Sequence, residues 1–425
     1  MITAQDIAIH RAAPVVRAPA AAFTERLLLL VLFVTVLASS VAFIEPSPHD
    51  ALMGVLTLAC LVAGVRFERS IALLFLLLLV WNVGGLISLL NVAGTEQTAQ
   101  YAVTSIYLAV AAVLFASLFA HNTMLRIVTV RAAYVLTATV ISIAGIVGYF
   151  GLFPGAHDLF ATNDRALGGF KDPNVFGPFL IWPALVVIER MLARRVQIAD
   201  IMIAGVLLFA LLLSFSRGAW FHFAVSCAVM MMLTFVVAPT PSVRMRIFGM
   251  SLIGLMALAG FVVLLLSFDS IGAMFRERAQ LVQSYDVGSG GRFTLQELAI
   301  ADLLNFPNGM GPFEFSRVHG LQQHNVYLQA FLVYGWAGGM AYVVLLAATL
   351  LLAMRAVLVA TPWQPYLIAA FATFVGEVAE GFVIDTDHWR HFFLLLGMIW
   401  GLGAATFNHV RTAMSEGRTG HVGAA

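Results

Sequence analysis

Long apolar runs, separated by short polar or charged segments, dominate the chain from residue 27 to residue 407. The runs are continuous rather than alternating, and most have the length of about 17–25 residues that a helix needs to cross a bilayer. This pattern predicts an all-α polytopic membrane protein and does not fit a transmembrane β-barrel, whose strands alternate apolar and polar positions. We predict about 12 transmembrane helices, at residues 27–44, 51–65, 70–90, 101–120, 132–153, 175–192, 200–214, 218–237, 247–267, 323–353, 366–384 and 391–407.

Composition agrees with this pattern, since 61% of the 425 residues are hydrophobic and only 11% are charged. The formal net charge is +1, and no basic tail or stripe is present, so nothing indicates a nucleic-acid partner. Cys60 and Cys227 both lie inside apolar runs and do not predict a disulfide framework.

The distribution of basic residues predicts the orientation. With the N-terminus in the cytoplasm, 15 of the 23 basic residues fall in inner segments and 8 in outer segments. Because cytoplasmic loops carry the excess of Lys and Arg, this favours an even number of helices with both termini cytoplasmic.

The predicted helices divide the chain into five parts. A cytoplasmic tail (1–26) precedes helices one to nine (27–267), a large outer loop (268–322), helices ten to twelve (323–407) and a second cytoplasmic tail (408–425). Within the loop, Phe275 to Ser284 and Phe293 to Leu304 place apolar residues at helical spacing, with Ser289-Gly290-Gly291 between them. We therefore expect two amphipathic helices that lie on the outer membrane surface.

Two arginines lie where helices are predicted to begin on the outer side. Ser216-Arg217-Gly218 stands between the seventh and eighth helices with almost no loop, so we expect Gly218 to permit a sharp turn. A guanidinium beside the free N–H groups of a helix N-terminus suits anion binding. Gly290-Gly291-Arg292 has the same arrangement. The alternatives are an Arg217 that snorkels to lipid headgroups and an Arg292 that is solvated in the loop.

His324 opens the predicted tenth helix, directly after the long outer loop. A neutral imidazole there can accept a proton, which suits a general base acting on a sugar hydroxyl. The alternative is an interfacial histidine satisfied by its neighbours, and His319 is a nearby competitor for the role.

Lys171, the only lysine in the chain, either pairs with Asp172 in a capping turn or contacts phosphate.

Four carboxylates lie late in the chain. Glu377 and Glu380 are three residues apart in the predicted eleventh helix and thus share a helix face. Carboxylates within a membrane are costly, so we expect ion pairs there, with an outer arginine as a suitable partner. Asp385-Thr386-Asp387 has the DxD form that many glycosyltransferases use to hold a metal, but the neighbouring histidine and arginine also suit simple neutralisation. We expect neither metal nor cofactor.

Several motifs together resemble the O-antigen ligase and Wzy-type polymerase family of bacterial membrane glycosyltransferases. They occur in the family's order over about residues 160–400: FKDPNVFGPFL at 170–180, SFSRGAW at 214–220, GGRF at 291–294, PNGMGPFEF at 307–315, HNVYLQAFLVYGWAGG at 324–339 and HWRHFFLLLG at 388–397.

This resemblance implies a GT-C-like helical fold and a glycan donor carried on undecaprenyl diphosphate, used without metal or nucleotide sugar. In the family's ligases, one arginine follows the helix before the turn, a second lies in the outer loop, and a histidine begins the next helix. Here Arg217, Arg292 and His324 take these positions and are the candidate catalytic residues. The same motifs supply four candidate substrate-binding residues: Lys171, Asn325, Tyr327 and Arg390.

We therefore predict inverting transfer of the lipid-linked glycan to an acceptor hydroxyl at the periplasmic face of the bacterial inner membrane. The acceptor is lipid A–core for a ligase and a lipid-linked glycan for a polymerase of O-antigen or exopolysaccharide, and the sequence leaves both open. Membrane lipids are the remaining partners. The alternative is a transporter or flippase of the same glycan, which would place polar residues near the midplane in broken helices.

Overall fold

The computed structural model describes residues 19–92, 95–193, 196–278 and 290–422. Most of the predicted N-terminal tail, Ser289 and the second half of the helix expected at 275–284 lie outside the described residues. The first half of the chain forms α1 (Pro19–Leu37), η1 (Ala38–Ser40), α2 (Pro48–Val62), η2 (Arg69–Ile71), α3 (Ala72–Ser88), η3 (Leu89–Asn91), α4 (Glu96–Ala120), α5 (Thr123–Tyr149), α6 (Ala156–Phe160), β1 (Ala161–Thr162), β2 (Arg165–Ala166), α7 (Pro173–Phe179), α8 (Ile181–Ala193) and α9 (Ile198–Leu213). The second half forms α10 (Arg217–Val237), α11 (Pro241–Leu266), α12 (Asp269–Arg278), α13 (Arg292–Asn305), α14 (Glu314–His319), α15 (Val326–Val357), α16 (Gln364–Glu380) and α17 (Arg390–Val422).

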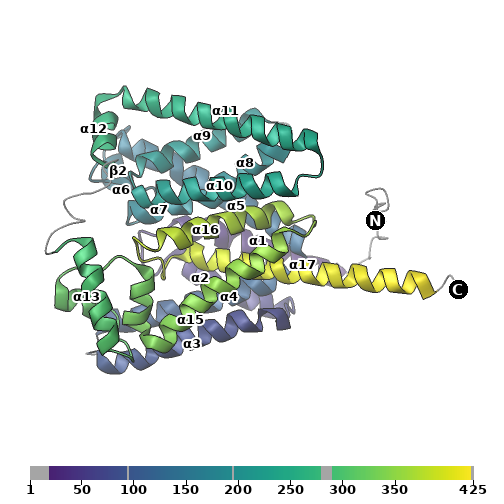
Figure 1. Ribbon diagram of the computed structural model, residues 1–425, viewed down its shortest axis with the longest axis horizontal. Helices are drawn as coiled ribbons and strands as arrows, with labels where there is room; N and C mark the ends of the chain where they lie inside the picture. Colours follow the sequence, from purple (N-terminus) through teal and green to yellow (C-terminus); the bar gives the residue numbers. More distant parts are fainter. Residues whose placement is uncertain (1–18, 93–94, 194–195, 279–289, 423–425) are drawn as a thin grey trace.

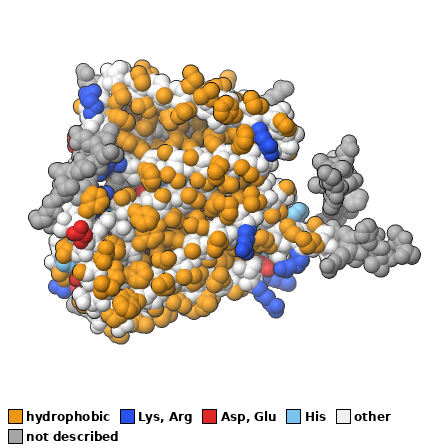
Figure 2. All heavy atoms as spheres, in the orientation of Figure 1, with side chains coloured by type: hydrophobic (Ala, Val, Ile, Leu, Met, Phe, Trp, Pro, Cys, Tyr) orange, Lys and Arg blue, Asp and Glu red, His pale blue; other side chains and the backbone are white. Residues whose placement is uncertain are grey.

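The helices confirm a multi-pass, all-α membrane protein. Among the described residues, nine helical segments are long and apolar enough to cross a bilayer, and α2 and α9 are shorter apolar helices. Every predicted span coincides with a helix, although 12 crossings and the GT-C-like arrangement stay predictions. Figure 2 shows hydrophobic side chains over the middle of the visible face, while Lys and Arg lie toward its two ends. This is the distribution expected for a protein whose middle contacts lipid.

Two predicted helices are interrupted, each for a local reason. The sixth divides into α7 and α8 because Pro183 has no N–H to donate to the carbonyl of Phe179. Within α15, Gly335 has φ 68° and ψ −178°, a conformation available essentially only to glycine. The loop segment 307–311 packs into this break: Met310 N donates to Leu332 O at 2.6 Å, and Trp336 N donates to Pro307 O at 2.8 Å.

Small residues allow the principal helix pairs to pack closely. Helices α4 and α17 meet at Gly397 and Gly401, where an added Cβ would lie 2.4 Å from Phe115 and 2.5 Å from the Ala116 carbonyl respectively. Gly376 brings α16 against α10 in the same way. In Figure 1, α17 runs from this packed bundle past its end, whereas α12 and α13 lie at the opposite end.

The described parts of the segment 268–322 contain helices, as predicted, but one of these helices packs on protein. The buried Leu295 and Ala299 of α13 contact a cluster that includes Leu332 of α15. Phe293 remains 54% exposed, so α13 keeps only part of its apolar surface for a membrane. The expectation of helices lying freely on the membrane was therefore incomplete, because the break in α15 offers the loop an apolar surface to cover. The described part of the first loop helix is α12.

Candidate active site

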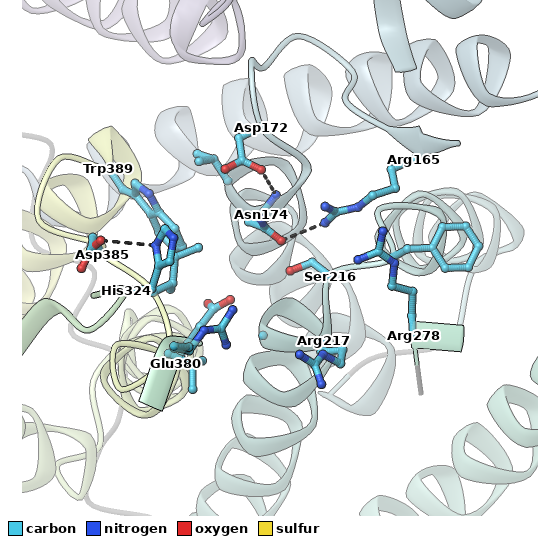
Figure 3. A pocket seen from close by; sticks show the side chains of 16 residues that line it. Arg165, Asp172, Asn174, Ser216, Arg217, Arg278, His324, Glu380, Asp385 and Trp389 are labelled. Carbon is cyan, nitrogen blue, oxygen red and sulfur yellow. Dashed lines mark hydrogen bonds and ion pairs between the residues drawn. The ribbon is translucent and has the colours of Figure 1, made fainter. Parts of the chain in front are cut away.

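A polar pocket lies where α7, α10 and α15 begin and α16 ends. Its volume is about 390 Å³, within the range of small-molecule sites. Figure 3 shows His324, Asp385 and Trp389 on one side and Arg165, Arg217 and Arg278 on the other. The three predicted catalytic residues all line it. The full lining is Arg165, Asp172, Asn174, Val175, Phe215, Ser216, Arg217, Gly218, Arg278, Arg292, His324, Glu380, Val383, Ile384, Asp385 and Trp389.

Arg217 is the first residue of α10 and follows a tight turn. The left-handed residue of that turn is Phe215 (φ 46°), and Ser216 caps the helix by accepting a hydrogen bond from Ala219 N at 3.3 Å. The prediction that Gly218 makes the turn was therefore wrong. Gly218 lies within the helix, and a Cβ there would stand 2.6 Å from Oε1 of Glu380. Its lack of a side chain lets α10 approach the carboxylate.

Arg292 is the first residue of α13, with Gly291 as the N-cap, which confirms the predicted helix start.

Arg165 is held firmly: its Nε donates to the carbonyl of Ser214 at 2.7 Å, and its Nη2 donates to Oδ1 of Asn174 at 2.8 Å. The β1–β2 hairpin places Arg165 through a two-residue turn, Asn163-Asp164, in which both residues have positive φ.

Arg165 and Arg278 were missed as site residues. From sequence they were only basic residues of outer segments, without a glycine or helix start beside them to mark an anion site. The Asn163-Asp164 pair could have indicated the hairpin that positions Arg165, since Asn and Asp tolerate the positive φ of tight hairpin turns. Nothing in the sequence separates Arg278 from Arg276 on the same helix.

His324 lies just before α15 rather than at its first residue. Its φ is 49°, and the next residue, Asn325, is the N-cap. Its Nδ1 lies 3.6 Å from Oδ2 of Asp385, with side-chain exposures of 50% and 20%. Burial raises the pKa of Asp385, an effect that Asp387 adds to and that the contact with His324 opposes. The arrangement is an imidazole–carboxylate pair at the pocket wall.

Glu380 presents a buried carboxylate to the pocket from the end of α16. Its Oε2 lies 2.8 Å from Nδ1 of His222, whose Nε2 lies 2.9 Å from the carbonyl of Thr373. Both side chains are fully buried. The partner of Glu380 is therefore a histidine of α10 and not the outer arginine that the sequence suggested. Glu377 lies deeper, 3.7 Å from His391.

The four predicted substrate-binding residues do not line the pocket, because each has a partner within the fold. Lys171 pairs with Glu45 at 3.0 Å rather than with Asp172. Asn325 caps α15 by accepting from Tyr327 N and Leu328 N. The hydroxyl of Tyr327 donates to Val378 O at 2.6 Å, and Arg390 binds both carboxylate oxygens of Asp50, at 2.9 and 2.8 Å.

Asp385 and Asp387 do not converge. Asp387 accepts from the hydroxyl of Tyr101 at 2.7 Å and lies 3.2 Å from Nδ1 of His388. Burial opposes ionisation of Asp387, but His388 and the hydrogen bonds outweigh it and lower the pKa. No group of three potential metal ligands occurs among the residues that the structure describes. The two carboxylates thus serve different partners, Asp385 at the pocket and Asp387 in the loop behind it.

Residues 202–343 match a protein-family model described as O-Antigen ligase. The matched segment contains Arg217, Arg292 and His324, whereas Glu380 and Asp385 follow it. No curated protein matches the chain. The resemblance predicted from the sequence is thereby confirmed for residues 202–343: this segment of a multi-pass membrane protein matches the O-antigen ligase model and contains the three candidate catalytic residues.

Proposed function

We propose that the protein transfers a glycan from undecaprenyl diphosphate to an acceptor hydroxyl, with inversion at the anomeric carbon and without a metal. One observation carries the proposal: Arg217, Arg292 and His324 line a single pocket, although they begin three different segments of the chain. Guanidinium groups suit a diphosphate, and an imidazole suits the removal of a hydroxyl proton.

On this proposal the diphosphate binds Arg217 and Arg292 by charge-assisted hydrogen bonds. The acceptor oxygen attacks C1 of the donor sugar, the bond from C1 to the diphosphate oxygen breaks, and undecaprenyl diphosphate leaves with the bonding electrons. The arginines stabilise the charge that develops on the leaving oxygen. A proton on Nδ1 of His324, facing Asp385, leaves Nε2 to accept the acceptor's hydroxyl proton.

We place the pocket at the periplasmic face of the inner membrane, with both termini in the cytoplasm. The long loop and the starts of α10, α15 and α17 then share one side, as an even number of crossings requires. In this orientation the pocket faces the leaflet in which a completed lipid-linked glycan would be presented. Membrane lipids and the donor are the partners that this location supports.

The proposed roles are tested by measuring transfer in membranes that contain equal amounts of each variant. We expect Arg217→Ala and Arg292→Ala each to lose about 100- to 1,000-fold in rate, as for the loss of one oxyanion donor. Arg217→Lys should also fail because an ammonium lacks the planar fork of donors. His324→Ala should be inactive, and His319→Ala, which changes a histidine outside the pocket, is its matched control. Undiminished transfer by Arg217→Ala would overturn the proposal.

The acceptor is identified by supplying lipid A–core and a lipid-linked repeat unit in separate reactions with the same reconstituted protein. Transfer to the first defines a ligase, and transfer to the second defines a polymerase. Movement of the donor across a vesicle bilayer without a new glycosidic bond would instead favour a transporter or flippase. The break in α15 gives little support to that alternative, since segment 307–311 fills it.

A further inference from the structure

We propose that Arg278 is a third phosphate-contacting residue, and that a ring stack between Trp220 and Phe275 holds it at the pocket. This inference rests on the proposed function and deepens it. Arg278 is the last residue of α12 and lines the pocket, opposite His324 and Asp385 (Figure 3). Its Nε is buried and has no hydrogen-bond partner among the described residues. A buried guanidinium nitrogen without a partner indicates a place for an anionic ligand.

The stack connects the two elements that carry the arginines. Trp220 follows Arg217 by three residues on α10, and Phe275 precedes Arg278 by three residues on α12. Residues at this spacing share a helix face. The Trp220 and Phe275 rings lie 5.1 Å apart at 23°, so the stack joins the two faces. It therefore links the helix faces from which Arg217 and Arg278 extend.

Trp220 is a fixed anchor for this stack, and on α12 the side chains of Phe275 and Met274 pack against the core. The indole Nε1 of Trp220 donates to the carbonyl of Leu211 at 3.2 Å. Helix α12 follows α11, in which most side chains are exposed or partly exposed and Ile247 and Leu265 are the buried residues. Figure 1 shows α11 along the edge of the bundle, with α12 turning toward the pocket end. The position of α12 at the pocket thus depends on the packing of Phe275 and Met274 against the core.

Charge explains what a third guanidinium contributes. The sugar-bearing diphosphate is a diester with two negative charges, and cleavage of the C1–O bond leaves a monoester that can carry a third. Arg217 and Arg292 match the ground state, and the nearby Arg165 is already bound to Ser214 and Asn174. An additional guanidinium therefore stabilises mainly the charge that appears during bond cleavage. Loss of such a group lowers kcat more than it raises KM.

The test compares Arg278→Ala with Arg276→Ala in the reconstituted full-length protein, with a lipid-linked glycan as donor. Arg276 is exposed, on the same helix, and outside the pocket lining, so its variant removes the same charge from the same element. We expect kcat to fall on the order of 10- to 100-fold for Arg278→Ala and less than about twofold for Arg276→Ala. Arg278→Lys should recover part of the rate. Inhibition by added undecaprenyl diphosphate should weaken in Arg278→Ala, because this product carries the extra charge.

The stack is tested by Phe275→Ala and Phe275→Tyr. The first should lower kcat in the same direction as Arg278→Ala, and the second, which keeps the ring, should restore it. Equal activities of Arg278→Ala and Arg276→Ala would overturn the role of Arg278. Arg217→Ala, measured beside them, separates this failure from failure of the proposed function. An inactive Arg217→Ala with a normal Arg278→Ala rejects only the third contact, whereas a fully active Arg217→Ala rejects the proposed function itself.

Discussion

Replacement of Asp385 by asparagine tests how His324 works. The substitution keeps the size of the side chain and removes the charge that lies 3.6 Å from Nδ1 of the imidazole. Two unit charges about 4 Å apart attract by about 1 kcal/mol in bulk water and about 4 kcal/mol near a protein surface. Since His324 is 50% exposed and Asp385 is 20% exposed, the stabilisation of the developing imidazolium should fall between these limits. About 1.4–2.8 kcal/mol corresponds to a 10- to 100-fold loss in kcat.

The assay is transfer from a lipid-linked glycan over a range of pH, with Asp302→Asn as the matched control. Asp302 pairs with His319 at 2.7 Å in the same outer loop, outside the pocket lining, so its variant breaks a similar pair. Asp385→Glu should retain more activity than Asp385→Asn because it keeps the charge. If Asp385→Asn and Asp302→Asn lose the same small factor, Asp385 does not assist the base and the reasoning fails.

The pH dependence provides a second readout. Burial raises the pKa of Asp385, so its carboxyl takes up a proton at a higher pH than an exposed aspartate does. The ionised form supports the base, and activity should therefore fall as pH drops through this raised pKa. In Asp385→Asn this titration is absent, so the acidic limb of the pH profile should change shape while the alkaline limb stays.

Three further substitutions test the scaffold. Gly218→Ala should lower the free energy of unfolding by about 1–3 kcal/mol and should slow transfer, because the new Cβ would stand 2.6 Å from a Glu380 oxygen. Normal activity and a normal Tm would contradict this close approach. Asp50→Asn removes the charged partner that Arg390 binds through two hydrogen bonds, at a cost of about 1.5–3 kcal/mol in the free energy of unfolding. The Tm of the protein in detergent should fall, whereas the rate of transfer should not fall as far as it does in Arg217→Ala. Gly397→Val should force α17 from α4 and reduce the yield of folded protein, measured by monodispersity in detergent.

Helix positions were predictable because the bilayer imposes a length and a polarity on each segment. Each predicted span coincides with a helix in the structure. The interruption of α15 was not predicted. Gly335 stands among apolar residues, and only the arrival of segment 307–311, from elsewhere in the chain, explains its left-handed conformation. Hydropathy reports the environment of a helix but not a distant loop that replaces its hydrogen bonds.

The site was predictable where a local signal marked it. Arg217 and Arg292 each begin a helix, His324 lies directly before the N-cap of another, and all three line the pocket. Tyr327 and Arg390 stand in similar places, yet their partners lie on other helices and direct them away from the pocket. Sequence position gives the end of the membrane at which a side chain lies. It does not give the direction of that side chain around the helix axis relative to distant partners.

The packing of α10 on α16 shows why the pocket contains carboxylates as well as arginines. Gly218 and Gly376 let the two helices approach so closely that His222 reaches Glu380. The carboxylate is thereby aimed at a pocket lined by four arginines, which would repel one another without nearby negative charge. Glu380 and Asp385 are the acidic side chains at the pocket that can supply this charge in addition to Asp172. The carboxylates thus make the cationic pocket compatible with a stable fold, and on the proposed function a diphosphate would replace them as the partner of the arginines.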